Sequence, residues 1–301
     1  MSKVFLSQRY LIFFVSLLLL SVSNEVFGKN ILFFFGLASQ SHRMAVWPLV
    51  ETLAEKGHNV TFFFGSTPKF THPQVVEFSA NDMVNFAERM GLRDFDMLGR
   101  RLIHGKSNVE TVWNDFLDMG ARLCDIILSD PNALRFINSS HFDLLIIDSI
   151  FNDCGIGLAY KFRAKHIIYS TTAAYMWFPE AYGYLDESSY YPSVQYSYPL
   201  EMSFYQRCLN SLRSLYWQFL RTQYLFPKLD KLFADKLELK NMPPLEDLEK
   251  NVSLVFVQRH FSEEVPRALP PLVVNVGGLH TFVDAKPLTQ VSYKQHIFLK
   301  N

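Results

Sequence analysis

The sequence predicts an α/β fold built on a doubly wound parallel sheet. Apolar runs of strand length alternate with segments of helical periodicity along the 301 residues. The runs are apolar at nearly every position, which is typical of parallel strands buried on both faces by helices. We find no internal repeat and no low-complexity segment.

The first three predicted elements form a β-α-β unit. "NILFFF" (30–35) has the pattern of a buried strand, and apolar residues recur at helical spacing from about His42 to Lys56. Gly57 ends this helix as a C-cap glycine, and "HNVTFFFG" (58–65) gives the second strand. Such a crossover is right-handed and leaves the two strands parallel.

The remaining elements continue the alternation. "YYPSVQYSYP" (190–199) is expected to be a loop. The expected strands are 142–148, 164–170, 252–258 and 272–278, and the expected helices are 109–128, which Asp130-Pro131 ends or kinks, 154–162 and 204–226.

The N-terminus predicts a signal peptide over residues 1–28. Basic residues precede "LIFFVSLLLLSV", which is too short to span a bilayer comfortably, and "VFG" (26–28) offers small residues for cleavage. A short membrane anchor is the alternative. No later run reaches about 18 apolar residues, so we expect no transmembrane helix after this segment and a location in the lumen of the endoplasmic reticulum.

Composition narrows the range of partners. Lys plus Arg and Asp plus Glu number 29 each, so no net charge favours nucleic acid as a partner. The 28 Phe and 14 Tyr fit an aromatic core, an apolar ligand pocket or a lipid-facing surface. The three cysteines form no CxxC pair, so we expect no metal site and buried free thiols, although a lumenal location would permit one disulfide.

Three asparagines stand in Asn-x-Ser/Thr sequences. We expect Asn138 and Asn251 to accept glycans. Asn59 lies inside a predicted strand, and we expect it to be too buried for modification.

Two titratable residues are predicted at the edge of the sheet where ligands bind. His42 follows the first strand, and Asp148 closes "LLIID" at the carboxyl end of another. An Asp bonded to one imidazole nitrogen leaves the other free to take a proton from a substrate hydroxyl. The alternatives are a surface or capping histidine and a helix N-cap aspartate. His58, beyond the other end of the helix, is expected to be structural.

Other chemistries lack their signatures. A single glycine, Gly36, follows the first strand, so a GxGxxG dinucleotide site is absent and an NAD-dependent oxidoreductase is disfavoured. No GxSxG sequence is present either, which disfavours an α/β-hydrolase.

Several segments together resemble the UDP-glycosyltransferases, the group that includes the UDP-glucuronosyltransferases. "SHRMAVWPLVETLAEKGHNVTFF" (41–63) resembles the N-terminal family motif, "FDLLIIDSIFNDCG" (142–155) resembles a second block, and "NVGGLH" (275–280) resembles the segment that closes the N-terminal domain. The resemblance covers roughly residues 29–285 and is specific in combination.

The resemblance implies a site and a reaction. By this resemblance, His42 is the base that deprotonates an acceptor hydroxyl, and Asp148 orients the imidazole of His42. The hydroxyl oxygen then attacks the anomeric carbon of a UDP-sugar in one inverting displacement. The co-substrate is UDP-glucose or UDP-glucuronate, with no cofactor, and the acceptors are small lipophilic compounds. Ser41 and the aromatic residues Tyr175, Trp177 and Phe178 are candidate acceptor contacts, with ordinary packing as the alternative for the aromatics.

The resemblance also implies a Rossmann-like N-terminal half of a two-domain GT-B fold, here residues 29–285. Residues 286–301 would be a linker or truncated tail, and the donor-binding half is essentially missing. The Asn152-Asp153 pair replaces the family's more usual proline, which leaves the local turn open. A non-catalytic lumenal partner that binds lipophilic ligands or regulates full-length transferases is the alternative function.

Two contacts with larger assemblies are also predicted. The chain is a candidate for homo- or hetero-oligomers with full-length relatives. The helix Phe204 to Phe226 combines aromatics with arginines, so it is either a peripheral membrane contact or a core helix.

Overall fold

The computed structural model describes residues 28–89, 109–193, 196, 198–260, 262 and 267–281. The predicted signal peptide, apart from Gly28, and the predicted tail 286–301 lie outside the described residues. Within the described part, no helix has both the length and the apolar character needed to cross a membrane.

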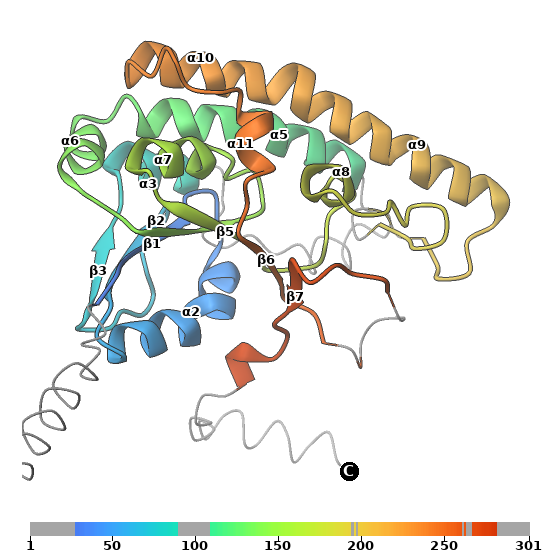
Figure 1. Cartoon of the computed structure of the whole chain (residues 1–301), viewed down its shortest axis with the longest axis horizontal. Helices are drawn as coiled ribbons and strands as arrows, with labels where there is room; N and C mark the ends of the chain where they lie inside the picture. Colours follow the sequence, from blue (N-terminus) through green and yellow to red (C-terminus); the bar gives the residue numbers. More distant parts are fainter. Residues whose placement is uncertain are drawn as a thin grey trace, which may run out of the picture.

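Seven parallel strands form one sheet in the order β3-β2-β1-β4-β5-β6-β7 (Figure 1). They are β1 (Asn30–Phe35), β2 (Asn59–Phe64), β3 (Val75–Phe78), β4 (Leu144–Asp148), β5 (Lys165–Ser170), β6 (Leu254–Val257) and β7 (Val273–Asn275). The chain builds outward from β1 to β3 and then returns to β4 on the other side of β1. This reversal places a topological switch point between β1 and β4, where open α/β sheets bind ligands.

Helices cover both faces of the sheet (Figure 1), which confirms the predicted doubly wound architecture. One face carries α2 (Gln40–Glu55) and the short 3₁₀ turn η3 (Leu279–Thr281). The other face carries the remaining described helices. They are α3 (Asn81–Arg89), α5 (Val109–Ile127), α6 (Pro131–Ser139), α7 (Cys154–Phe162), α8 (Phe178–Tyr182), α9 (Phe204–Leu220), the π-helical segment η2 (Arg221–Leu225), α10 (Phe226–Lys236) and α11 (Leu245–Glu249).

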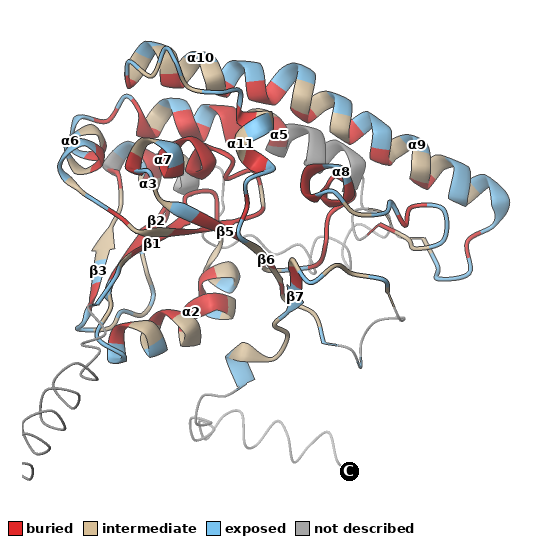
Figure 2. Cartoon of the chain, viewed as in Figure 1, coloured by how far each residue is buried: buried red, intermediate tan, exposed pale blue. Residues whose placement is uncertain are grey.

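Strand side chains alternate between two apolar layers. Phe33 and Phe62 point to the α2 side, where their rings stack at 5.7 Å, while Phe34 and Phe63 point to the opposite layer. All four are fully buried or nearly so, and β1 is coloured mostly as buried in Figure 2. The uninterrupted apolar runs in the sequence therefore reflect strands that are covered on both faces.

The structure contains elements that the sequence analysis did not predict. They are strand β3 and the helices α3, α6, α8 and α11, which are too short for a clear periodic signal. Asp130 does end one helix, but it also caps the next, because its carboxylate accepts from the amides of Asn132 and Ala133. The helix expected to stop at Phe226 continues through η2 and α10 to Lys236.

The expectation of free buried thiols is wrong for all three cysteines, since two are paired and the third is exposed. Cys124 of α5 and Cys154 of α7 form a disulfide, and Cys208 is free and exposed. Spacing could not indicate this pair, because only the packing of α5 against the start of α7 brings the two Cα atoms to 5.5 Å.

The prediction that Asn59 is buried is also wrong. Asn59 is exposed at the first position of β2, where its side-chain amide donates to Asn30 Oδ1 at 2.9 Å. Asn138 and Asn251 are exposed as well, so all three sequences are accessible in the folded chain.

Candidate active site

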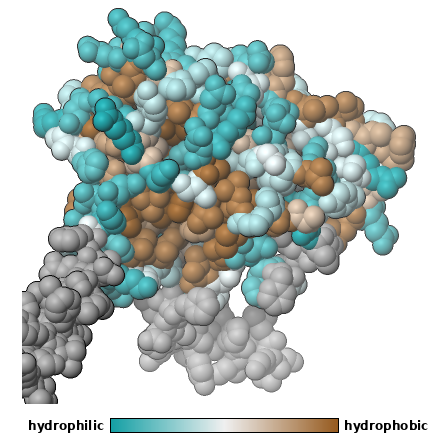
Figure 3. Space-filling model, viewed as in Figure 1, coloured by the Kyte–Doolittle hydropathy of each residue, from teal (hydrophilic) through white to brown (hydrophobic). Residues whose placement is uncertain are grey.

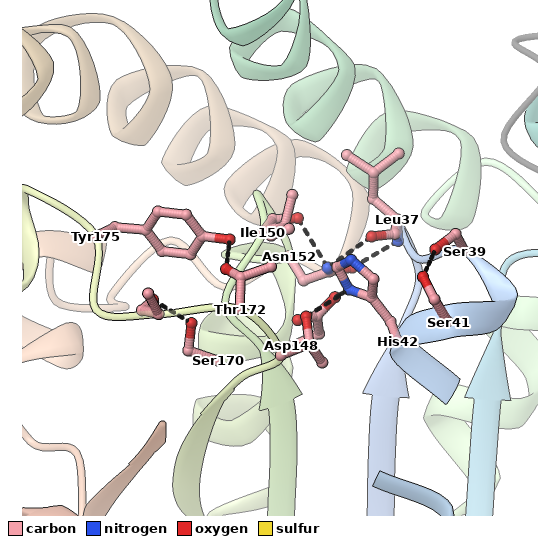
Figure 4. Close-up of polar contacts among 12 residues, drawn as sticks. Leu37, Ser39, Ser41, His42, Asp148, Ile150, Asn152, Ser170, Thr172 and Tyr175 are labelled. Carbon is pink, nitrogen blue, oxygen red and sulfur yellow. Dashed lines mark hydrogen bonds and ion pairs between the residues drawn. The ribbon is translucent and has the colours of Figure 1, made fainter. Parts of the chain in front are cut away.

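His42 and Asp148 meet at the switch point of the sheet (Figure 4). His42 lies in the first turn of α2, just beyond the carboxyl end of β1, and Asp148 is the last residue of β4. Because β1 and β4 are parallel neighbours, their carboxyl ends lie side by side. His42 Nδ1 is 2.7 Å from Asp148 Oδ2.

The contact fixes what each imidazole nitrogen can do. An ionised carboxylate only accepts hydrogen bonds, so Nδ1 of His42 donates to Asp148 and Nε2 keeps its lone pair. The Asp148 side chain is fully buried, whereas 15% of the His42 side chain is exposed. The imidazole can therefore reach a substrate while the carboxylate can act only through it. The N-cap alternative for Asp148 does not apply, because α7 begins at Cys154.

The loop after β5 adds polar groups beside the pair. Thr171 Oγ1 lies 2.9 Å from His42 Nδ1 and can accept part of the same hydrogen bond. Thr172 Oγ1 is 2.8 Å from the Tyr175 hydroxyl. Burial, together with the charge of Asp148, raises the pKa of Tyr175 above its usual range, so this phenol stays protonated.

Asn152 links the loop after β1, which leads to His42, with the loop after β4, which follows Asp148. Its Oδ1 accepts from the Leu37 amide at 2.6 Å, and its Nδ2 donates to the carbonyls of Leu37 at 3.2 Å and Ile150 at 2.9 Å. The residue is almost fully buried. The sequence marked this position only as a departure from the expected proline, and that departure did not indicate a clamp between the loops.

Helix α2 is held in place by a second group that sequence reasoning missed. Arg43, next to His42, is fully buried, and its guanidinium donates to both carboxylate oxygens of Glu77, at 2.5 and 3.0 Å. It also lies over the rings of Trp47 and Phe62. On the other side, the Tyr169 hydroxyl is 3.2 Å from the carbonyl of Ala45.

The other predicted site residues have different surroundings. Ser41 is exposed and bonds to Ser39 through the two hydroxyls at 2.7 Å. Trp177 and Phe178 are buried, and the Trp177 ring stacks on Tyr175 at 4.7 Å between centroids. The structure thus shows the packing alternative for these rings, and contact with an acceptor stays a prediction.

His58 lies at the opposite end of α2 from His42. Its Nδ1 accepts a hydrogen bond from the Lys29 amide at 3.1 Å and thereby ties the start of β1 to the loop before β2. This contact agrees with a structural role.

Comparisons with known proteins identify the family. The family model described as "UDP-glucoronosyl and UDP-glucosyl transferase" matches residues 34–296. The chain belongs to the UDP-glycosyltransferase family.

Relatives in this family include a UDP-glucosyltransferase 2 from Dactylopius coccus, which is 29% identical over 272 residues that make up 90% of this chain and 51% of the relative. A UDP-glucuronosyltransferase 2B33 from Macaca mulatta is 26% identical, over 83% of this chain and 49% of the relative. This UDP-glycosyltransferase chain thus spans about half the length of the curated relatives it matches. A solved structure of CalG4, the calicheamicin glycosyltransferase, aligns with a TM-score of 0.41 at 12% identity, covering 83% of this chain and 51% of that one.

Proposed function

We propose that this chain supplies the acceptor side and the catalytic base of a UDP-sugar-dependent glycosyltransferase. The observation that carries the proposal is the 2.7 Å contact between His42 Nδ1 and Asp148 Oδ2 at the switch point of the sheet. Membership in the family supports a UDP-sugar as donor.

In the proposed step, Nε2 of His42 takes the proton of an acceptor hydroxyl. The hydroxyl oxygen forms a bond to the anomeric carbon of the sugar as the bond from that carbon to UDP breaks, so the configuration inverts. Asp148 holds the imidazole in the required tautomer and stabilises the imidazolium once the proton has transferred. A base positioned in this way contributes about 10²–10⁴-fold to the rate.

The proposed acceptors are small lipophilic hydroxyl compounds, and the proposed donor is UDP-glucose or UDP-glucuronate. Relatives with glucosyltransferase and glucuronosyltransferase names match at similar identity, so both donors belong in the test. Among the aromatic candidates, Tyr175 has its hydroxyl 2.8 Å from Thr172 Oγ1, in the loop beside His42, and its ring is almost fully buried.

We place the protein in the lumen of the endoplasmic reticulum, with glycans on Asn138 and Asn251. The disulfide between Cys124 and Cys154 supports an oxidising compartment, because such bonds are rare in the cytosol. The exposure of both asparagines supports their modification.

A fusion of this chain to the C-terminal half of a full-length relative tests the proposed roles. Transfer from UDP-glucose and UDP-glucuronate to a lipophilic phenol is measured for the fusion and for its variants. We expect His42→Ala to lower turnover by about 10²–10⁴-fold and Asp148→Asn to lower it strongly. His58→Ala, at the far end of the same helix, is the matched control and should leave turnover unchanged.

Turnover that survives both His42→Ala and Asp148→Asn would overturn the assigned roles. Binding of the phenol without transfer by an otherwise folded fusion would favour the alternative, a non-catalytic lumenal binder.

A further inference from the structure

Helix α9 is attached to the protein through the buried ring of Trp217 and through buried polar side chains. Its inward side carries the polar residues Asn210 and Ser214, which are buried and hydrogen-bonded. The amide of Asn210 donates to the carbonyls of Ser188 and Tyr191 at 2.7 and 2.9 Å, and the Ser214 hydroxyl donates to the carbonyl of Met176 at 2.8 Å. Polar anchors therefore hold this helix to the protein where a core helix would present leucines.

From Tyr205 to Phe219, the exposed apolar side chains of α9 lie on the opposite side of the helix, whereas Trp217 packs inward. At 3.6 residues per turn they fall within an arc of about 100°. Three of them, Leu212, Leu215 and Phe219, are each 61% exposed. We call this surface the α9 outer face, and its residues are Tyr205, Cys208, Leu212, Leu215, Tyr216 and Phe219.

The face lies at the periphery of the molecule. Helix α9 extends away from the sheet on the right of Figure 1, exposed residues alternate with inward ones along it in Figure 2, and hydrophobic side chains are seen on that flank in Figure 3. Exposed apolar side chains that gather in one strip of a surface helix, unlike singly scattered ones, point to contact with another apolar phase.

Charge around the outer face has one sign. No Asp or Glu occurs in α9, whose two arginines are Arg207 and Arg213. On the helical wheel Arg207 and Arg213 flank the outer face on opposite sides. Arg207 is exposed, and Arg213 lies 4.0 Å from the ring centroid of Tyr196. Aromatic and aliphatic residues bordered by arginines are the composition of helices that lie in an anionic lipid surface.

The area favours a bilayer over a protein partner. The strip from Tyr205 to Phe219 is about 21 Å long at 1.5 Å per residue and about 10 Å wide, or about 200 Å², against about 800 Å² per partner in a stable protein interface. A bilayer needs no matching surface, and burial of a few large apolar side chains in it suffices for reversible binding.

From these observations we propose that the α9 outer face docks the protein onto an anionic lipid bilayer, with the helix parallel to the membrane plane. The leucine and aromatic side chains enter the boundary between headgroups and acyl chains, and the flanking arginines contact lipid phosphates. The inward polar anchors keep α9 attached to the sheet while its apolar side is in lipid.

Cys208 provides a direct probe, because it lies in the outer face and the other two of the three cysteines are paired. A polarity-sensitive fluorophore on Cys208 of the mature full chain is mixed with vesicles of phosphatidylcholine containing 30% phosphatidylserine, a composition chosen at about the anionic content that attracts basic surfaces. We expect a blue shift that falls when phosphatidylserine is omitted or when salt is raised.

Sedimentation of unlabelled protein with the same vesicles tests the residues. Leu212→Asp with Phe219→Asp should lower the partition coefficient at least about tenfold, since each loses a buried apolar contact. Leu185→Asp is the matched control, because Leu185 is 79% exposed outside the helix, and it should bind like the parent. Both variants alter exposed side chains, so circular dichroism should report unchanged folding.

Three outcomes would overturn the proposal. They are absence of vesicle binding by the parent, equal loss in the Leu185→Asp control, and a dimer in analytical ultracentrifugation that the double variant dissociates while vesicles remain unbound. The last of these would assign the face to a second copy of the chain.

Discussion

At the scale of single residues, His166 makes the stability of the fold depend on pH. Burial, with Lys165 beside it, lowers the pKa of His166 to about 4 from an ordinary value of 6.5. The unfolded chain therefore binds this proton more readily than the folded one, so stability is full above about pH 6.5 and falls as pH drops towards 4. Between these pH values the free energy of unfolding falls by an amount that approaches about 3 kcal/mol.

Urea unfolding at pH 7 and pH 4.5 measures this effect. His166→Gln removes the titrating group and should flatten the difference between the two pH values. His141→Gln, at an exposed site, should keep the parental difference. An equal pH dependence in all three proteins would rule out His166 as the source.

Asn152 is the residue whose side chain connects the two site loops. Asn152→Ala leaves the buried amide and carbonyl of Leu37 without their partner, so we expect the free energy of unfolding to fall by about 2 kcal/mol. In the fusion described above, turnover should fall as well, because His42 and Asp148 lose their common clamp. Asn132→Ala, which removes an exposed contact to Arg135, is the control, and a loss no larger than the control's would contradict the clamp.

At the scale of elements, the disulfide between α5 and α7 anchors the start of α7. Cys124 and Cys154 are 30 residues apart, and closing a loop of that length contributes about 3–4 kcal/mol through the unfolded state. We expect Cys124→Ser with Cys154→Ser to lower the free energy of unfolding by about this amount, measured by urea denaturation. Cys208→Ser should have no such effect, and reducing agent should destabilise the parent but not the double variant.

The elements show what pattern alone could and could not predict. Long apolar runs such as 30–35 and 144–148 identified their strands, because a strand buried on both faces leaves a strong signal. β3 did not, since it has only four residues at the edge of the sheet and only the first of them, Val75, is buried. The sequence prediction ended the helix at Phe226, whereas the chain stays helical to Lys236, with Pro227 in the first turn of α10 after a π segment.

At the scale of the whole molecule, the candidate site depends on topology more than on local sequence. Residues 42 and 148 are 106 positions apart, and strand ends alone did not say that their strands are neighbours. Only the order β1-β4 makes them so. Before the structure, the pairing of the two residues was implied by the family resemblance and not by periodicity. Asn152 and Arg43 could not be foreseen, because their roles are set by loops and strands distant in the sequence.

A buried ion cluster joins the helical layer to the loop that follows the site. Arg221 of η2 contacts Asp153, before α7, at 2.5 Å and Glu249 of α11 at 2.7 Å, and all three are buried. Burial disfavours the Arg221 cation, but Glu249 and Asp153 outweigh it and raise its pKa. Burial likewise raises the pKa of Glu249, although Arg221 opposes this. The two carboxylates therefore depend on one guanidinium.

Removing that guanidinium should be far more costly than removing an exposed one. We expect Arg221→Met to lower the free energy of unfolding by about 3–5 kcal/mol, because two buried carboxylates lose their counter-charge. The loss should shrink as pH falls, since the unpaired carboxylates then take up protons in the folded state. Adding Asp153→Asn and Glu249→Met should restore most of the stability. Arg122→Met, which removes a largely exposed contact to Asp118, should change it by less than about 0.5 kcal/mol, and a similarly small loss at Arg221 would show that the cluster does not hold the helical layer to the sheet.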